Sequence, residues 1–435
     1  MEDVVSRGPQ RGPSAGARYD AIVVGARCAG APTAMLLARK GHRVLLVDRA
    51  SFPSDTLSTL WIHAPGVAAL ARWGLLDAVT ATGCPPITTY AFDFAEPGPT
   101  NGAQGRLRRP EPFGPFTIAG TPRPHDGVST AYAPRRTVLD KILVDAAVRA
   151  GVEVRERFTV DDVLVEDGTV AGIRGRGDGG TTVTERARVV IGADGRYSRV
   201  ARAVRPAQYH DVPRLQQPYY TFWSGLPVDG AETVIRGDRA WAAVPTNDGL
   251  TLLVVGWPFA EAAAYKADIE GNYLRTLDVE PAWAARVRAA TREERFLGGA
   301  VPNFFRTPYG PGWALVGDAG YTKDPVTAQG ISDAFRDAEL CATALDDAFT
   351  GRRAFDDAMF GYQHARDARA LPIYDFTTQM AALEPPPPQM QHLLGAVSRN
   401  RDAMDAFVSV VAGTLSPVEF FHPDHIGPIM AAATT

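Results

Sequence analysis

The sequence predicts an α/β protein in which a Rossmann-like dinucleotide-binding domain carries an inserted antiparallel β-sheet domain and leads into a helical C-terminal region. Three observations point to this fold class. A strand, a glycine turn, a helix and a second strand follow one another early in the chain, strand-like runs alternate with turn residues in the middle, and helical spacing prevails near the end. With 435 residues, the chain has room for about two or three domains.

The early unit is a βαβ motif. Tyr19–Gly25 is a short apolar run with β-branched residues, which predicts a buried strand. A helix is expected over Gly30–Lys40, where Gly41 ends it, and Val44–Asp48 predicts a second buried strand. Strands joined through a helix in this way are parallel, so the unit predicts a parallel sheet.

The composition changes at about Tyr219, where a second architecture begins. Asp-Gly, Gly-Asp and Asn-Asp-Gly turns separate short strand-like runs, which predicts an antiparallel meander. These runs are Tyr219–Leu226, Thr233–Arg236, Trp241–Pro245 and Leu250–Trp257. Helical sequence is expected to follow as far as about Arg295. A strand at Trp313–Val316 and a helix at Gly330–Ala348 then return the chain to the first domain.

The predicted domains are therefore discontinuous. The stretch 97–127 is rich in glycine and proline and predicts a long irregular, lid-like insertion. The expected divisions are a flexible tail at 1–18, the dinucleotide-binding domain at 19–90, 131–205 and 296–348, the inserted domain at 91–130 and 206–295, and the helical region at 349–435.

Composition excludes several classes of protein. A formal net charge of −4 at pH 7 argues against a strongly basic nucleic-acid binder. No uncharged stretch is long enough to span a bilayer, so no membrane insertion is expected. Three widely spaced cysteines do not suggest a disulfide framework, and the first residues lack the apolar segment of a signal peptide. We therefore expect a cytoplasmic protein.

The glycine turn of the βαβ unit predicts a phosphate-binding site. Gly25 permits a tight turn, Gly30 lets the helix approach the strand closely, and the helix N-terminus offers N–H groups to a pyrophosphate. Asp48, at the end of the second strand, can accept hydrogen bonds from a ribose. Arg27 replaces the middle glycine of the usual pattern, so it either pairs with the phosphates or crowds them.

Two further motifs place an aspartate after a buried strand. One is Gly192-Ala193-Asp194-Gly195-Arg196-Tyr197-Ser198, and the other is Gly317-Asp318-Ala319-Gly320, which runs on to Gln329-Gly330-Ile331. Aspartates in this position lie at the carboxyl edge of a parallel sheet, where ligands bind. A literal G-x-G-x-x-G at Gly175–Gly180 lies between two strands and precedes no helix, so it predicts only a hairpin turn.

With these three motifs in this order, the sequence resembles the single-component (group A) FAD-dependent monooxygenases, which share the fold of para-hydroxybenzoate hydroxylase. Their wider superfamily includes geranylgeranyl reductases and flavin-dependent halogenases. The resemblance covers about residues 19–348 and implies that the Rossmann-like domain binds FAD and that the inserted sheet is a substrate domain. It implies FAD contacts from Gly25, Ala26, Arg27, Gly30, Asp48, Arg49, Arg136, Val160, Asp194, Asp318, Gln329, Gly330 and Ile331.

The resemblance also implies an activity. NADPH or NADH would bind transiently and reduce FAD. O2 would then add to the reduced FAD to form a flavin C4a-hydroperoxide, which would oxygenate an aromatic or polycyclic small molecule of secondary metabolism. The FAD motifs are shared with C=C reductases of the geranylgeranyl type, which stay the main alternative. A halogenase is less favoured because Arg49–Asp140 contains no lysine and Trp241–Pro245 only partly matches the halogenase motif. A non-catalytic flavin-binding module is a third alternative.

The sequence names candidates on the substrate side without deciding their orientation. Alternation places Tyr220 and Phe222 on one face of a strand and Trp223 on the other. With Trp241, these aromatic residues are the expected substrate-lining set. His63, just after a presumed flavin-covering loop, is the candidate for a proton role.

Two further features of the sequence bear on the flavin site and on metal binding. Tyr321, Asp324-Pro325 and Thr327 depart from the family pattern beside the expected flavin ring. No metal site is expected, because prolines interrupt the segment that holds Glu419, His422 and His425.

Overall fold

The computed structural model describes residues 18–95 and 114–433, and it confirms the predicted α/β fold class. The predicted tail, apart from Arg18, and much of the predicted insertion lie outside these residues. The first sheet has the order β19-β20-β10-β1-β2-β7, in which all strands are parallel except the edge strand β19. Its strands are β19 (Tyr309–Gly310), β20 (Trp313–Leu315), β10 (Thr182–Gly192), β1 (Tyr19–Val24), β2 (Val44–Val47) and β7 (Glu153–Arg155).

Both faces of this sheet are buried, which explains the continuous apolar runs in the sequence. Ala21 and Val23 face the helices α1 (Gly30–Arg39), α4 (Arg136–Arg149) and α9 (Gly330–Phe349). Ile22 and Val24 point the other way, towards the hairpin β8 (Thr159–Glu166) and β9 (Thr169–Arg176) and the helix α5 (Arg199–Val204). The turn after β9 holds the literal glycine motif and is the hairpin turn that the sequence predicts.

The second sheet has the order β16-β12-β15-β14-β13-β4-β5, and β17 also pairs with β12. The predicted runs form its centre, but β12 pairs with β15 and not with its neighbour in sequence. Strand β4 joins parallel to β13, so the prediction of a simple meander is wrong at both edges. The strands are β16 (Thr291–Arg292), β12 (Gln216–Ser224), β15 (Leu250–Pro258), β14 (Arg239–Pro245), β13 (Ala231–Arg236), β4 (Tyr90–Ala95), β5 (Phe116–Gly120) and β17 (Leu297–Gly298).

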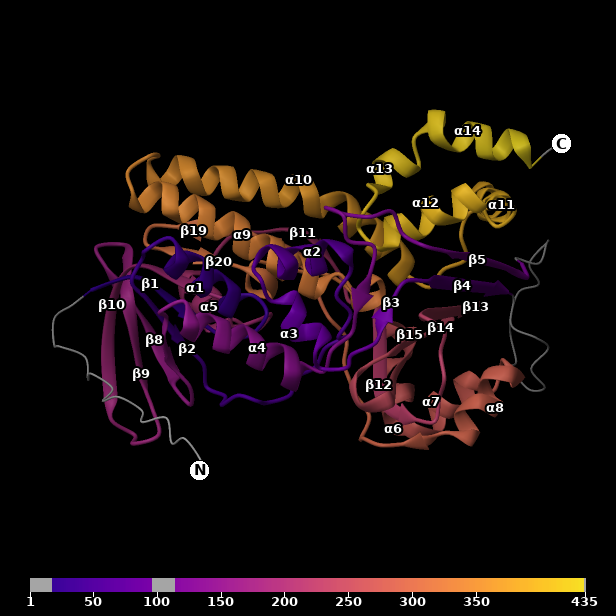
Figure 1. Ribbon diagram of the computed structural model, residues 1–435, viewed down its shortest axis with the longest axis horizontal. Helices are drawn as coiled ribbons and strands as arrows, with labels where there is room; N and C mark the ends of the chain where they lie inside the picture. The colour runs from indigo at the N-terminus through magenta and orange to yellow at the C-terminus, as the bar shows by residue number, and fades with distance from the viewer. Residues whose placement is uncertain (1–17, 96–113, 434–435) are drawn as a thin grey trace, which may run out of the picture.

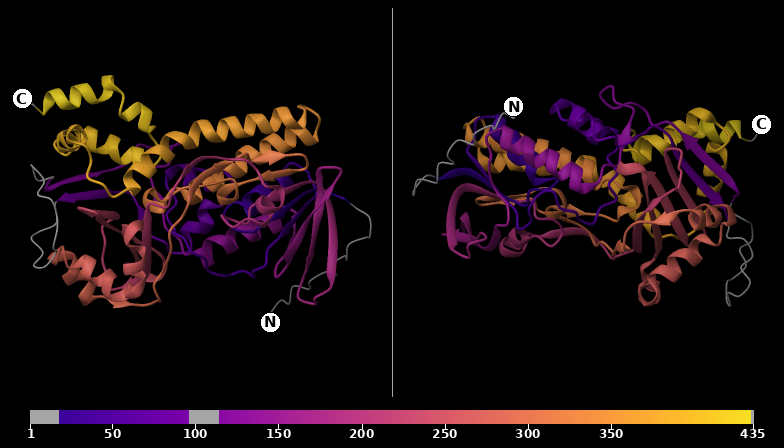
Figure 2. Two further views of the ribbon diagram at one scale, coloured as in Figure 1. Left: turned by 180° about the vertical axis from the view of Figure 1, so that it is seen from behind. Right: turned by 60° about the horizontal axis from the view of Figure 1, so that its bottom comes forward.

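Helices cover the two faces of the second sheet from different parts of the chain (Figure 1). One face packs against α6 (Ala262–Ala267), α7 (Ile269–Leu277) and α8 (Pro281–Ala289). The other face packs against the C-terminal helices α11 (Pro388–Val397), α12 (Arg401–Val411), α13 (Pro417–Phe420) and α14 (Pro423–Ala432). The long helix α10 (Phe355–Ala381) runs beside α9 and connects the two halves of the molecule, as the left view of Figure 2 shows.

Smaller elements lie between the two sheets. A three-stranded sheet, β11-β18-β21, pairs Gln208 of β11 with Arg306 of β18, which are far apart in sequence. The remaining elements are α2 (Ala64–Arg72), α3 (Leu76–Thr80), β3 (Pro86–Ile87), β6 (Ala131–Tyr132), β11 (Gln208–Val212), β18 (Asn303–Arg306) and β21 (Tyr321–Thr322). Four short 3₁₀ turns, η1 to η4, cover Asn247–Gly249, Phe259–Glu261, Gly317–Ala319 and Pro325–Thr327. Within the described residues, no helix has the length and apolar character needed to cross a bilayer.

The orientation of β12 and β14 corrects one expectation. Trp223 stacks on Tyr273 with ring centroids 6.4 Å apart, and Trp241 contacts Trp283 edge-on at 6.4 Å. Both tryptophans therefore belong to the core under α6–α8, and neither lines a substrate cavity. Tyr220 and Phe222 occupy the opposite face, as strand alternation requires.

Replacing Trp241 by alanine tests this assignment. The side chain is 1% exposed, so Trp241→Ala should lower the free energy of unfolding by about 3 to 5 kcal/mol. Urea denaturation measures this change, and Val165→Ala, at a site that is 55% exposed, is the control with almost no expected effect. Affinity for FAD should stay at the wild-type value. A stable Trp241→Ala protein with altered ligand binding would contradict the assignment.

Candidate functional site

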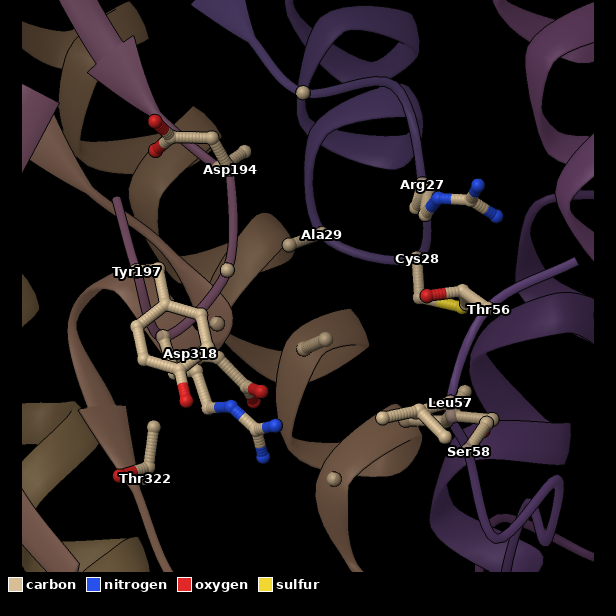
Figure 3. Close-up of a pocket in the computed structure, with 18 of the residues that line it drawn as sticks. Arg27, Cys28, Ala29, Thr56, Leu57, Ser58, Asp194, Tyr197, Asp318 and Thr322 are labelled. Carbon is tan, nitrogen blue, oxygen red and sulfur yellow. The ribbon is translucent and has the colours of Figure 1, made fainter. Parts of the chain in front are cut away.

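A cavity of about 920 Å³ lies at the carboxyl ends of β1, β2, β10 and β20, where an open parallel sheet binds ligands. It extends to the second sheet, where Pro218, Tyr220 and Val254 form part of its wall. Figure 3 shows two opposing sides, with Arg27, Cys28, Thr56, Leu57 and Ser58 on one and Asp194, Tyr197, Asp318 and Thr322 on the other. The cavity thus joins the predicted dinucleotide site to the inserted sheet.

The glycine turn after β1 allows a backbone approach that no side chain would permit. Gly25 has a φ of +101°, and a Cβ atom there would lie 2.5 Å from the carbonyl oxygen of Ala193. A Cβ atom on Gly30 would lie 1.8 Å from the carbonyl oxygen of Gly25. Only glycine fits at both positions, so the turn keeps the first N–H groups of α1 beside the cavity.

Asp48 joins this turn to the end of β2. Its Oδ2 accepts a hydrogen bond from the N–H of Ala26 at 2.7 Å, and its Oδ1 accepts one from the N–H of Ala50 at 2.8 Å. Each carboxylate oxygen can accept a second hydrogen bond. Asp48 lines the cavity and so can bind a ribose hydroxyl while it holds the glycine turn.

The structure decides what Arg27 does. Its guanidinium donates to Asp140 at 2.6 Å and to the carbonyl oxygen of Ser54 at 3.2 Å, so it is held at the cavity wall. Arg136 donates to both oxygens of the same carboxylate, at 2.9 and 3.0 Å. Asp140 is fully buried and balances only one of the two arginines. The cluster of Arg27, Arg136 and Asp140 therefore carries one net positive charge, which favours a phosphate group.

Asp194 and Asp318 also face the cavity, and among the described residues neither has a cationic partner in hydrogen-bonding contact. Asp194 accepts a hydrogen bond from the N–H of Arg199 at 2.6 Å, whereas its buried Oδ1 has no partner in the protein. Burial raises the pKa of Asp194, and burial likewise raises the pKa of Asp318. Such acceptors fit the hydroxyl groups of a ribose or a ribityl chain, which can donate to them.

The N-terminus of α9 points its free N–H groups towards the cavity. Gln329, Gly330 and Ile331 line the cavity, and the 20-residue helix behind them has no side-chain cap. Gln329 fixes this end by donating to the carbonyl oxygen of Val411 in α12 at 2.6 Å. Because the positive end of the helix dipole favours negative charge, this position suits the anionic edge of a reduced flavin ring.

A buried charge cluster supports the same end of α9. Lys323 and Arg336 both pair with Asp333, and although burial opposes ionisation, these two cations hold the pKa of Asp333 at about 2. Tyr321 accepts a hydrogen bond from Arg336 at 3.0 Å and stacks on Phe305 with ring centroids 4.8 Å apart. Tyr321, which departs from the family pattern, therefore belongs to this packed network of side chains.

Asp324 is a buried carboxyl group in the cavity wall with no cationic partner among the described residues. It is 1% exposed, its Oδ1 accepts from the N–H of Val326 at 3.1 Å, and its buried Oδ2 has no partner in the protein. Burial raises the pKa of Asp324 to about 7, and the hydrogen bond from the N–H of Val326 offsets this only in part. A carboxyl group with this pKa can hold or release a proton near neutral pH.

His63 does not lie at the cavity. It is fully buried, with Nε2 3.0 Å from the carbonyl oxygen of Thr327 and Nδ1 2.8 Å from the hydroxyl of Tyr90. Burial lowers the pKa of His63 to about 4. A neutral ring that donates to Thr327 and accepts from Tyr90 satisfies both nitrogens. The structure thus shows a satisfied core histidine at the candidate position.

Most of the residues expected to bind FAD line this one cavity. They are Gly25, Arg27, Asp48, Arg49, Arg136, Val160, Asp194, Asp318, Gln329, Gly330 and Ile331. Ala26 and Gly30 lie behind the wall and shape the turn. Of the expected substrate-lining residues, only Tyr220 is in the wall, because Phe222 lies beneath Arg135, whose guanidinium carbon is 4.0 Å from the ring centroid.

Sequence reasoning missed several wall residues. Tyr197, Arg202, Thr322 and Lys323 are the clearest examples. Tyr197 lies in the motif at residues 192–198, so its place in the cavity wall could have been inferred from the sequence. Lys323 carried no signal, because only the folded network brings its side chain to Asp333.

The segment considered for a metal has another role. His422 accepts a hydrogen bond from the N–H of Asp424 and caps α14, while His425 packs against Phe420 with ring centroids 5.2 Å apart. In the described residues, no group of three or more potential ligands converges on one point.

The residues present fit FAD. The glycine turn leaves room that a Cβ atom would fill, one net positive charge faces that turn, and Asp194 keeps an unpartnered buried oxygen at the cavity. A pyrophosphate requires the first two features, and the hydroxyl groups of a ribose or ribityl chain require the third.

Comparisons with known proteins agree with this geometry. Residues 18–217 match the family described as FAD binding domain. The chain is 28% identical over 401 residues to the 6-methylpretetramide 4-monooxygenase of Streptomyces rimosus, covering 86% of this chain and 87% of the relative. It is 26% identical over 344 residues to the digeranylgeranylglycerophospholipid reductase of Methanocella arvoryzae, covering 75% and 77%. The structure of a myxobacterial chondrochloren halogenase superposes with a TM-score of 0.72 at 24% identity, covering 95% of this chain and 96% of that one.

A substitution at Gly30 tests the close approach that shapes the cavity. Gly30→Ala should weaken FAD binding roughly tenfold or more, because the new Cβ atom must displace the carbonyl of Gly25. Titration of the FAD-free protein with FAD, followed by flavin fluorescence, measures the affinity. Gly395→Ala is the matched control, since its Cβ atom meets open space on a helix. Equal FAD affinity in both variants would show that the approach is dispensable.

A substitution at Asp324 tests its buried proton. The folded state keeps the proton up to about pH 7, whereas the unfolded chain releases it near pH 4, so the free energy of unfolding falls as the pH rises between these values. Asp324→Asn removes this loss. Its stability relative to wild type should increase by about 2 to 3 kcal/mol between pH 5 and pH 8. Urea denaturation at the two pH values measures the difference, and a constant difference would refute the raised pKa.

Proposed function

Because this chain is an FAD-dependent oxidoreductase of the superfamily that includes group A flavin monooxygenases, we propose that it is a monooxygenase. It uses NADPH or NADH together with O2 to oxygenate an aromatic or polycyclic small molecule in secondary metabolism. The observation that carries this proposal is the single cavity that joins the dinucleotide cradle to one face of the inserted sheet. A cofactor in the cradle and a substrate against the sheet would share this one cavity.

We assign the parts of the cavity as follows. The turn at Gly25 and Gly30 and the charge of Arg27 and Arg136 bind the FAD pyrophosphate, and Asp48 binds the adenosine ribose. Asp318 binds the ribityl chain. When bound, FAD supplies the redox and oxygen chemistry, while the protein supplies geometry and a water-poor site.

The chain's own residues then orient the substrate. Tyr220 accepts a hydrogen bond from the N–H of Ser58 at 3.2 Å, which keeps its own hydroxyl proton available to a ligand. Pro218, Val254 and Val301 provide apolar contacts for a flat guest. Asp324 holds a proton, or accepts one from a substrate hydroxyl group, at the boundary between the two sheets. The proton role of His63 stays a prediction that the geometry of the cavity does not support.

The similarity to the Methanocella arvoryzae reductase keeps a second candidate in view. A reductase would use the same FAD cradle and would not need O2. The two activities differ in whether the reduced flavin reacts with O2 to oxygenate a substrate, and the reaction of the reduced protein with O2 therefore distinguishes them. A cytoplasmic location is part of the proposal, and the three unpaired cysteines, Cys28, Cys84 and Cys341, support it.

Rapid mixing of the reduced holoenzyme with O2 tests the proposed function. The bound flavin is first reduced with NADPH or NADH under argon and then mixed with oxygenated buffer, with and without a panel of polycyclic phenols. A monooxygenase should show a transient absorbance that matches neither oxidised nor reduced flavin, and free reduced FAD is the control. Direct reoxidation under every condition would favour the reductase. If neither nucleotide reduces the flavin, a two-component enzyme or a non-catalytic flavoprotein becomes the better account.

A further inference from the structure

Lys323 lies in the wall of the main cavity, and its side chain is only 5% exposed. The chain has four lysines, and the other three are on the surface. The side chains of Lys40 and Lys141 are 37% and 42% exposed, and Lys266 is also an exposed residue. Burying an ammonium group costs free energy unless the charge is paired. The place of Lys323 in this wall therefore carries a cost that the surface lysines avoid.

Two elements hold the ammonium group of Lys323 at the end of α9. Lys323 lies between β21 and η4, and its Nζ donates to Asp333 of α9 and to the hydroxyl of Tyr321 at 3.2 Å. The N–H of Asp333 donates to the carbonyl oxygen of Gln329 at 2.9 Å, so the ion pair lies one helical turn from the free N–H groups of α9. Lys323, Asp333 and Gln329 all line the cavity. The cation therefore lies beside the positive end of the α9 dipole.

Asp333 is shared between two cations, so it neutralises Lys323 only in part. Arg336 donates to the other oxygen of Asp333 at 2.6 Å. Among the described residues, Asp333 is the one carboxylate within ion-pair distance of Lys323, whereas Arg336 also pairs with Asp337 at 3.0 Å. Lys323 is in the cavity wall and Asp337 is not. The carboxylate that completes the charge balance therefore lies behind the wall.

The charges of Lys323 and Asp333 act differently on the two sides of their ion pair. Burial raises the pKa of Asp318 in the cavity wall, and Lys323 opposes this rise more strongly than Asp333 adds to it. Burial lowers the pKa of His63 behind the wall to about 4, and of the two charges Asp333 has the larger effect there. The positive end of the pair therefore faces Asp318 in the cavity, and the negative end faces the core.

We infer that Lys323 sets the affinity of this protein for reduced relative to oxidised FAD, and that Asp333 directs and limits its charge. Oxidised flavin that gains two electrons and one proton becomes an anion, and a nearby cation stabilises that anion more than the neutral oxidised ring. The charge of Lys323 then adds to that of the α9 dipole and raises the reduction potential of bound FAD. The inference goes beyond the proposed oxygenation, because a reductase with the same cradle would use the same charge.

Reduction potentials of the FAD-loaded protein test this inference without NADPH or O2. The protein is titrated with dithionite under argon in the presence of a reference dye. Lys323→Met should lower the affinity for reduced relative to oxidised FAD about tenfold, which for a two-electron couple lowers the potential by about 30 mV. Lys323→Arg keeps the charge and should stay close to the wild-type potential. Lys266→Met, on α6 and outside the cavity, is the control and should change nothing.

Asp333→Asn is the second variant, and its expected shift has the opposite sign. Without the carboxylate, the charge of Lys323 is no longer compensated, so the potential should rise by about 30 mV, or tenfold in relative affinity. An ion pair that only supported the fold would not produce opposite shifts. In Lys323→Met, Asp333 keeps Arg336 as its partner, so this variant should fold even where Asp333→Asn does not. The comparison with Lys323→Arg then decides alone.

Four results would overturn the inference. They are an unchanged potential in Lys323→Met, equal shifts in Lys323→Met and Lys323→Arg, a fall in potential in Asp333→Asn, and an equal loss of affinity for oxidised and reduced FAD. The last result would mean that Lys323 holds the cofactor in both redox states. If the potentials shift as expected but the reduced protein reacts with O2 as a reductase would, the inference stands and the proposed function fails.

Discussion

The contact between the end of β1 and the loop after β10 is the constraint on which the rest of the site depends. The backbone at Gly25 passes so close to Ala193 that a Cβ atom would overlap its carbonyl group, and Gly30 approaches Gly25 even more closely. These close contacts hold the turn after β1 against the loop after β10, at the edge of the sheet where the carboxyl ends of the parallel strands lie. Asp48 then ties the turn to β2 through the N–H of Ala26. A wider separation would detach the N-terminus of α1 from the carboxylates that share its cavity.

The charges around this edge of the sheet differ from one part of the cavity to the next, so each part of the cavity suits a different chemical group of the cofactor. Asp140 is buried between Arg27 and Arg136 and leaves one positive charge beside the glycine turn. Asp194 and Asp318 provide acceptors further along the cavity, and the free end of α9 favours negative charge beyond them. Removing a buried partner such as Asp140 would leave two uncompensated cations, so this balance is structural as well as functional.

The inserted sheet separates stability from recognition by using its two faces differently. Trp223 and Trp241 pack under α6–α8, where they contribute to the core. The opposite face carries Tyr220 to the cavity and is covered elsewhere by the C-terminal helices. Asp324 lies where this sheet meets the three-stranded sheet, because its N–H donates to Asn303 of β18 at 2.6 Å. A proton-holding group therefore sits at the junction of the two halves of the molecule.

The sequence by itself determined the α/β fold class, the first βαβ unit, the glycine turn and the two aspartate motifs, because these depend on local periodicity and on the backbone freedom of glycine. It also determined that Tyr220 and Trp223 face opposite ways, since side chains alternate along a strand. Tertiary structure alone decided which face meets the cavity, because that depends on the helices that cover the sheet. It also decided that Arg27 binds Asp140 and that His63 is buried. Each of these outcomes joins residues far apart in sequence, and no local pattern encodes such distances.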